Sequence, residues 1–330
     1  IEGSLVASGG SLTFNAYNLS PNGSVSPIEL PPPNIGRGGF FLGSGAFLST
    51  AGAIVDDRPG SLLQTTDVTG GGSISIRSFS ADLAVGSIID VSGGVYVDGG
   101  GGTAYGNAGG ISILTGRDLT LQSVTGGEFR LGSTLKGFSG AKGGSLTIGT
   151  LAVQIGGDTA ADGTFHLQSP FFGQGGFASF NISGIGRSDV PALLVKSGTM
   201  IAPSVQSWQL RGLGSDRPLT LVSMVRPEGL RSPVSLSFTA SGLRSDIGGL
   251  LLVRGDLVVE AGAHVEAGAA GSISLKGDTV TVHGALVARG GSIQINGASR
   301  MPALVAPTVA SSTVWLSGSA RLDVSGMTLL

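Results

Sequence analysis

Apolar and polar residues alternate in short runs along most of the chain, and glycine precedes many of these runs. Such alternation is typical of a β-strand that buries one of its two sides. One phrase, a glycine or glycine pair followed by an alternating segment, occurs in six near-copies, at residues 9–14, 71–76, 109–113, 143–148, 271–275 and 290–295. The sequence therefore predicts six equivalent short strands.

Two further phrases recur between these strands. A short turn followed by alternating apolar residues, with aspartate as its second residue, occurs at residues 81–85, 117–121, 255–259 and 277–282. A closing phrase, Asp-Val-Ser-Gly after an aliphatic residue, occurs at residues 89–93 and 322–326. We interpret each copy of the aspartate phrase as a turn that leads into a strand, and the closing phrase as one turn used twice.

Strands this short cannot bury an apolar side alone and gain stability only when equivalent strands stack on them. Where the copies are cleanest, 20 residues separate Ser272 from Ser292. We therefore predict an all-β fold, a right-handed parallel β-helix (β-solenoid) with protruding loops, because parallel crossovers are right-handed. The predicted side-chain directions are inward for Ile273, Leu275, Val280 and Val282, and outward for Ser274, Thr279, Thr281 and His283. With about 21 residues in each coil and about 4.8 Å between coils, the chain would form about fifteen coils in a rod about 70 Å long.

The regularity of the phrases divides the chain into three stretches. Residues 1–157 are predicted to be β-solenoid coils, with a glycine-rich loop near residues 95–107 that protrudes from a coil boundary. Residues 158–249 are expected to form a less regular, decorated segment of the same solenoid, and residues 250–330 return to regular coils.

Composition supports a folded chain with many turns, since 59 residues are glycine, 41% are apolar and only 12% are charged. Cysteine is absent, which excludes disulfides and thiolate metal sites. The net charge of −2 comes from residues of both signs spread along the chain, so we expect no nucleic-acid partner. No apolar run reaches the roughly 18 residues of a membrane-spanning helix, so we expect no transmembrane segment.

The order of these phrases resembles that of the filamentous-haemagglutinin-like proteins, the large exoproteins of two-partner secretion systems. Residues 172–177 and 182–184 add to the resemblance, as does Val314-Trp315-Leu316 before the second closing phrase. The resemblance implies a secreted protein at the bacterial cell surface, exported through an outer-membrane secretion partner, with a structural role in adhesion, aggregation or biofilm formation. The family's amino-terminal secretion domain and a terminal effector module are not seen, so we expect an internal or truncated segment.

Two sets of residues suggest binding chemistry. Arg254-Gly255-Asp256 is an integrin-type tripeptide that could engage a host receptor if it were exposed, although the aspartate phrase explains the same residues as a turn. Glu260, His264 and Glu266 could share a face and hold a cation, but an intervening glycine is expected to turn the chain. His166, like His283, is expected to be an outward strand residue. We therefore predict no metal site.

Parallel β-helices also host enzymes that cleave polysaccharides, so a cluster of carboxylates would be a catalytic candidate. The available acids are Asp56, Asp57, Asp158, Asp162 and Asp246, and most of them stand in turn contexts that favour solvated corners. We predict no catalytic residues and no cofactor. The expected partner is a ligand on a host-cell, matrix or carbohydrate surface. A carbohydrate-active enzyme and a passive stalk for an effector elsewhere remain the alternatives.

Overall fold

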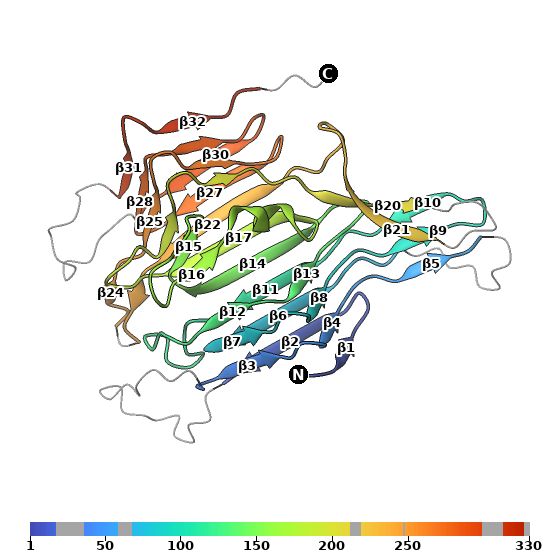
Figure 1. Cartoon of the computed structure of the whole chain (residues 1–330), viewed down its shortest axis with the longest axis horizontal. Helices are drawn as coiled ribbons and strands as arrows, with labels where there is room; N and C mark the ends of the chain where they lie inside the picture. The colour runs from blue at the N-terminus through green and yellow to red at the C-terminus, as the bar shows by residue number, and fades with distance from the viewer. Residues whose placement is uncertain (18–35, 59–67, 212–218, 247, 299–312, 327–330) are drawn as a thin grey trace.

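The structure is a computed structural model that describes residues 1–17, 36–58, 68–211, 219–246, 248–298 and 313–326. The chain folds into β-strands, most of them in parallel sheets (Figure 1), as the sequence predicted. One short 3₁₀ helix, η1 (Ser169–Gly173), is the sole helix of these ranges. None of the described helical structure is long and apolar enough to cross a bilayer.

An eight-stranded sheet extends from the first coil to the last described one, and all neighbouring strands in it are parallel. Figure 1 shows its strands following one another from blue to red. In spatial order they are β2 (Ser11–Ala16), β6 (Ser73–Ser78), β11 (Gly110–Leu114), β14 (Gly144–Leu151), β17 (Phe177–Ile185), β22 (Ser235–Ser241), β27 (Ser272–Lys276) and β30 (Ser292–Asn296). The six glycine phrases supply six of these strands, and Ser272 pairs with Ser292 as their spacing predicted.

Between successive strands of this sheet the chain visits a second row and then a third row of short strands. The second row consists of a sheet β3 (Gly39–Leu42), β7 (Ser80–Leu83), β12 (Phe129–Leu131) and a sheet β16 (Phe165–Leu167), β15 (Val153–Ile155), β18 (Leu193–Val195), β25 (Asp256–Val259), β28 (Thr279–Val282), β31 (Val314–Leu316). The third row consists of a sheet β1 (Ser4–Val6), β4 (Phe47–Ser49), β8 (Ile88–Asp90), β13 (Thr134–Lys136) and a sheet β19 (Met200–Ile201), β26 (His264–Glu266), β29 (Ala285–Val287), β32 (Arg321–Asp323). Both closing phrases end a third-row strand in the same turn, since Asp90 and Asp323 each accept the amide N–H two residues later at 2.9 Å.

The second and third rows are each interrupted at the same level of the stack. Between β14 and β17 the chain forms β15, turns back into β16 and then forms η1. In this coil η1 replaces the third-row strand that neighbouring coils have. The amide of Gly137, just after β13, donates to the carbonyl of Gly175, just after η1, at 2.7 Å. The eight-stranded sheet alone continues through this level.

Apolar side chains from all three rows form one continuous core. Ile273, Leu275, Val280 and Val282 are fully buried in it, which confirms their predicted inward direction. Thr279 was predicted to face solvent and this was wrong: it is buried, and its hydroxyl donates to the carboxylate of Asp256 on the neighbouring strand. The bond removes the cost of burying the hydroxyl.

The glycines that begin the long strands are required by close stacking of the coils. A Cβ placed on Gly72 would lie 1.7 Å from the carbonyl oxygen of Gly10, and one on Gly109 would lie 1.7 Å from that of Gly72. Gly291 stands in the same relation to Gly271. Gly72, Gly109 and Gly291 do not have a positive φ, so it is the close approach of the neighbouring coil that requires glycine here.

Antiparallel hairpins project from the stack (Figure 1). Residues 95–107, expected to be a loop, form β9 (Val95–Val97) and β10 (Thr103–Tyr105), and β9 also pairs with β5 (Ile54–Asp56). Strands form here because Val95 and Val97 are buried in a second small core with Leu210. Two further hairpins are β20 (Gln206–Arg211) with β21 (Thr220–Val225), and β23 (Leu243–Arg244) with β24 (Leu251–Val253).

These projections make the stack shorter than the sequence suggested. Residues 158–249 contribute β17 and β22 to the eight-stranded sheet, but they also supply η1 and most of two hairpins. The described sheet has eight strands, and the estimate of about fifteen coils was therefore too high. At about 4.8 Å between neighbours, eight strands extend over roughly 35 Å.

Candidate ligand-binding face

The outward side of the eight-stranded sheet carries columns of small polar side chains. Register pairing places one residue from each strand in a central column, and all eight are exposed or half-buried. From β2 to β30 they are Thr13, Ser75, Ser112, Thr147, Asn181, Ser237, Ser274 and Gln294. Every member has a hydroxyl or amide group and none is charged.

Two flanking columns lie two residues before and two residues after the central one. The first holds serine on seven of eight strands, with Gly110 as the exception. The last is more varied and includes Arg77 and Lys276. Neighbouring members lie about 4.8 Å apart along a column and roughly 7 Å apart along a strand, so the face is a regular lattice of hydrogen-bonding groups. We call these three columns the polar face.

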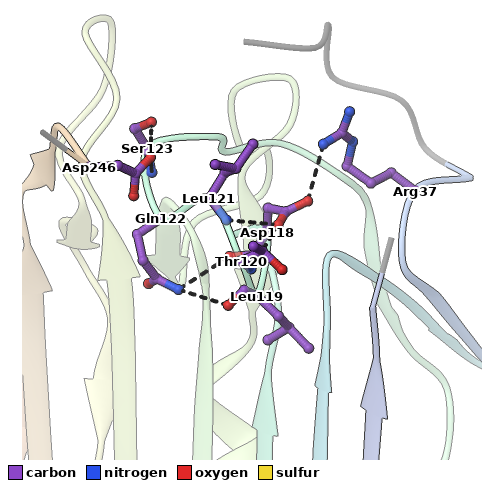
Figure 2. Close-up of polar contacts among 8 residues, drawn as sticks. All are labelled: Arg37, Asp118, Leu119, Thr120, Leu121, Gln122, Ser123 and Asp246. Atoms are coloured by element: carbon purple, nitrogen blue, oxygen red, sulfur yellow. Dashed lines mark hydrogen bonds and ion pairs between the residues drawn. The ribbon is translucent and has the colours of Figure 1, made fainter. Parts of the chain in front are cut away.

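A loop between β11 and β12 covers one edge of the polar face (Figure 2). The aspartate phrase at residues 117–121 was predicted to lead into a strand, and this was wrong. The carboxylate of Asp118 accepts the amide N–H groups of Thr120 at 2.8 Å and Leu121 at 3.0 Å, which bends the chain into a turn. The strand of this coil, β12, begins later, at Phe129.

Two long-range contacts hold this loop. Arg37 donates to the Asp118 carboxylate at 3.1 Å, and the two side chains are only 7% and 4% exposed. At the other end, the amide and hydroxyl of Ser123 donate to the Asp246 carboxylate, the amide at 3.0 Å (Figure 2). Burial raises the pKa of Asp118, but the amides of Leu121 and Thr120 and the Arg37 guanidinium outweigh it and hold that pKa below its usual value.

Replacing Asp118 by asparagine is expected to lower the free energy of unfolding at pH 7 by about 3 kcal/mol, because Arg37 would remain buried without a counter-charge. A carboxyl with a lowered pKa stabilises the fold above its unfolded pKa of about 3.9, and this contribution is lost as the pH falls through the lower, folded pKa. Urea unfolding at pH 7 and at pH 3 measures both effects. The variant should lose less stability on acidification than the parent, and an equal loss would contradict the assignment.

The loop and the ends of β6, β11, β14, β17 and β22 enclose a hollow of about 330 Å³. Two guanidinium groups line it, those of Arg77 from the polar face and Arg117 from the loop. Arg117 Nη1 donates to Gln122 Oε1 at 3.2 Å, whereas its buried Nε has no hydrogen-bond partner in the described part of the chain. Burial lowers the pKa of Arg117, and the charge of Asp246 opposes this shift. Four residues with hydroxyl groups also line it, and so do three apolar residues: Thr115, Thr150, Ser183 and Ser241, and Leu114, Leu119 and Ile185.

The Arg254-Gly255-Asp256 tripeptide is engaged within the fold. Arg254 Nη2 donates to the Asp256 carboxylate at 2.6 Å, and the same carboxylate accepts a hydrogen bond from the Thr279 hydroxyl. Gly255 is buried, and its amide donates to Asp278 at 2.8 Å. The side chains of Arg254 and Asp256 are 13% and 27% exposed. This geometry favours the turn interpretation over a receptor-binding motif.

The three residues considered for a metal do not share one cluster. Glu260 accepts from Lys196 Nζ at 3.0 Å and from the Ser197 amide, whereas His264 Nε2 lies 3.2 Å from Glu266 Oε2. No group of three or more His, Asp or Glu residues that could hold a metal ion is found within the described ranges. His166 is half-buried, with Nε2 3.0 Å from the carbonyl oxygen of Gly156.

The five acids considered for catalysis lie in three places. Asp56 pairs with Arg58 at 2.7 Å, and Asp57 is buried beside Tyr96 in the projecting strands. Asp158 and Asp162 are exposed between β15 and β16. Asp246 binds Ser123. The structure therefore leaves the five acids in different places along the stack.

Another hollow, of about 590 Å³, lies beside η1 at the interruption of the third row. Its walls include Phe138, Phe165 and Phe171, with Lys136 and His166 among the polar residues. None of the described residues that line it is acidic. The convergence of these phenylalanines depends on the backward turn into β16.

Comparisons with known proteins do not identify the chain. No protein-family model matches it, no curated protein sequence matches it, and no solved structure matches it. The resemblance to filamentous-haemagglutinin-like proteins therefore stays a prediction.

Proposed function

We propose that this chain is a segment of a right-handed β-solenoid rod in a secreted bacterial surface protein, and that it adheres to hydroxyl-rich surfaces through its polar face. The observation that supports this proposal is the central column, in which eight parallel strands present eight uncharged hydroxyl or amide groups in register. The three recurring rows around one core support the solenoid. Export through an outer-membrane partner is part of the same proposal.

Multivalency is the proposed mechanism of adhesion. A hydrogen bond from one serine or threonine to a hydroxyl on another surface exchanges against water and contributes little by itself. A rigid repeated array presents the second and later groups at high effective concentration once the first has bound, so many weak contacts add to a stable attachment. Polysaccharides fit this array because they offer uncharged hydroxyl groups at regular intervals.

Placing charges in the central column tests the proposal. Ser112→Glu together with Ser237→Glu is expected to reduce retention of the chain on insoluble xylan, cellulose or chitin by about tenfold or more, because both changes interrupt the array. A control variant places two glutamates on the second row instead, Val258→Glu together with Thr281→Glu, at positions that are half-buried. The control should be retained like the parent.

Three results would count against the proposal. Equal loss in both double variants would make charge alone the cause. Absence of retention on every carrier would contradict adhesion to polysaccharide and favour a passive stalk. Release of shortened, soluble sugar from a carrier would favour a carbohydrate-active enzyme.

A further inference from the structure

The hollow between the polar face and the loop at residues 115–127 is cationic. Arg77 belongs to the last column of the polar face, is exposed, and forms no ion pair with any residue that the structure describes. Arg117 brings a second guanidinium from the loop. A guanidinium presents several N–H donors in a planar fork, which suits a carboxylate or another planar anion.

The acidic groups near the hollow are already engaged. Asp118 is the one acid that lines it, and Arg37 neutralises this carboxylate from the opposite side at 3.1 Å. Asp246 accepts two hydrogen bonds from Ser123 (Figure 2), and its negative charge acts on Arg117. No acidic residue of the described chain forms an ion pair with Arg77, so the hollow keeps an excess of positive charge. An anion entering the hollow would compensate this charge.

The rest of the lining indicates what carries the anion. Thr115, Thr150 and Ser183 line the hollow together with the two arginines, and Ser183 itself belongs to the last column of the polar face. A ligand that suits this lining has a carboxylate and hydroxyl groups on the same small ring. The hollow opens from a face whose central column offers only neutral hydrogen-bonding groups.

We propose that this hollow binds the carboxylate of a uronic acid residue within an acidic polysaccharide that lies along the polar face. Arg77 and Arg117 hold the carboxylate, the threonine and serine hydroxyls contact the sugar hydroxyls, and the columns bind the neighbouring sugars. This inference rests on the proposed adhesion to polysaccharide and adds a charge requirement to it.

Polygalacturonate and its fully methyl-esterified form are the matched probes, because esterification removes the negative charge and leaves the sugar backbone in place. The parent chain is expected to bind polygalacturonate at least about tenfold more tightly than the ester, and added salt should weaken only the binding of the acid. Arg77→Gln and Arg117→Gln should each weaken polygalacturonate binding by about tenfold and leave the ester unaffected. Isothermal titration calorimetry measures all of these affinities.

Two control variants sharpen the test. Arg289→Gln removes one exposed positive charge far along the chain, next to Gly290, and should leave polygalacturonate binding unchanged. Arg77→Lys keeps the charge but loses the fork, so it should bind with intermediate affinity. Arg77 is exposed on a strand of the sheet, so its variants are expected to unfold at the parent's temperature even if Arg117→Gln disturbs the loop.

Equal affinity of the parent for the acid and the ester would overturn the inference, as would unchanged binding in the Arg77→Gln variant. Either result, with both polymers still bound, would leave the proposed adhesive function intact. Failure of both polymers to bind would overturn the inference about the hollow, whereas the adhesive function would fail only if xylan, cellulose and chitin also did not retain the chain.

Discussion

Replacing Gly109 by alanine is expected to lower the free energy of unfolding by about 3 kcal/mol or more, because the new methyl group has no space between two coils. Its carbon would lie 1.7 Å from the carbonyl oxygen of Gly72. The obstacle is backbone of the neighbouring coil, so relief would require β6 and β11 to move apart and would weaken the hydrogen bonds that join them.

Urea unfolding followed by circular dichroism measures this loss. Gly45→Ala is the matched control, since no atom lies within 4 Å of the position its new carbon would take and its φ is not positive. The control is expected to change stability by less than about 0.5 kcal/mol. Equal stability of the two variants would show that the coils can separate at little cost.

Replacing Phe180 by alanine is expected to cost about 3–5 kcal/mol, the range for removing a fully buried phenylalanine from a core. Phe180 lies on β17 and is 0% exposed. Its ring centroid lies 5.3 Å from that of Phe172 and 6.0 Å from that of Phe177, in edge-to-face contacts. The deletion would therefore leave a cavity where η1 packs against the eight-stranded sheet.

Thermal and urea unfolding both report this effect. Ser179→Ala is the control, because Ser179 directly precedes Phe180 on the same strand and lies on the outward side, in the first column of the polar face. It should change stability by less than about 0.5 kcal/mol. A loss below about 1 kcal/mol in Phe180→Ala would mean that the surrounding rings close the cavity.

Local alternation was sufficient to predict most of the eight-stranded sheet. Two strands were missed for separate reasons. β17 follows a glycine pair, Gly175 and Gly176, but the register shifts at its start, and the extra residue hides the repeat. β22 begins after Pro233 and Val234 and has no glycine before it. Its pairing with β17 and β27 therefore depends on the buried side chains and not on the phrase.

The loop at residues 115–127 could not be predicted from its own residues. Its aspartate phrase resembles those at β7, β25 and β28, of which only Asp278 precedes its strand, whereas Asp82 and Asp256 lie within theirs. The phrase at residues 117–121 differs from these in its partners, which are distant in sequence. Asp118 pairs with Arg37, 81 residues earlier, and Ser123 binds Asp246, 123 residues later. These contacts appear only when the coils are stacked in register.

The candidate site also has one part that the sequence predicts, the central column, and one part that it does not, the hollow. The outward direction of Ser274 followed from period two alone, and the central column repeats that rule on every strand. Predicting the hollow would have required knowing that Arg77 pairs with Leu114. This register places Arg77 beside β11, the strand that precedes Arg117. Arg77 directly follows a glycine phrase and Arg117 begins an aspartate phrase, so both were explained by the strand and turn pattern and neither was marked as a site.

The interruption beside η1 has a mechanical consequence. If the two ends of the stack are pulled apart, the hydrogen bonds between neighbouring coils must break before the connecting chain and the core can extend. Above β12 and β13 the second and third rows change to new sheets, so the load concentrates on the pair β11–β14 and a few turns such as Gly137 to Gly175. The segment should therefore yield first at this level under force, and separate there into two blocks that each keep three rows of strands.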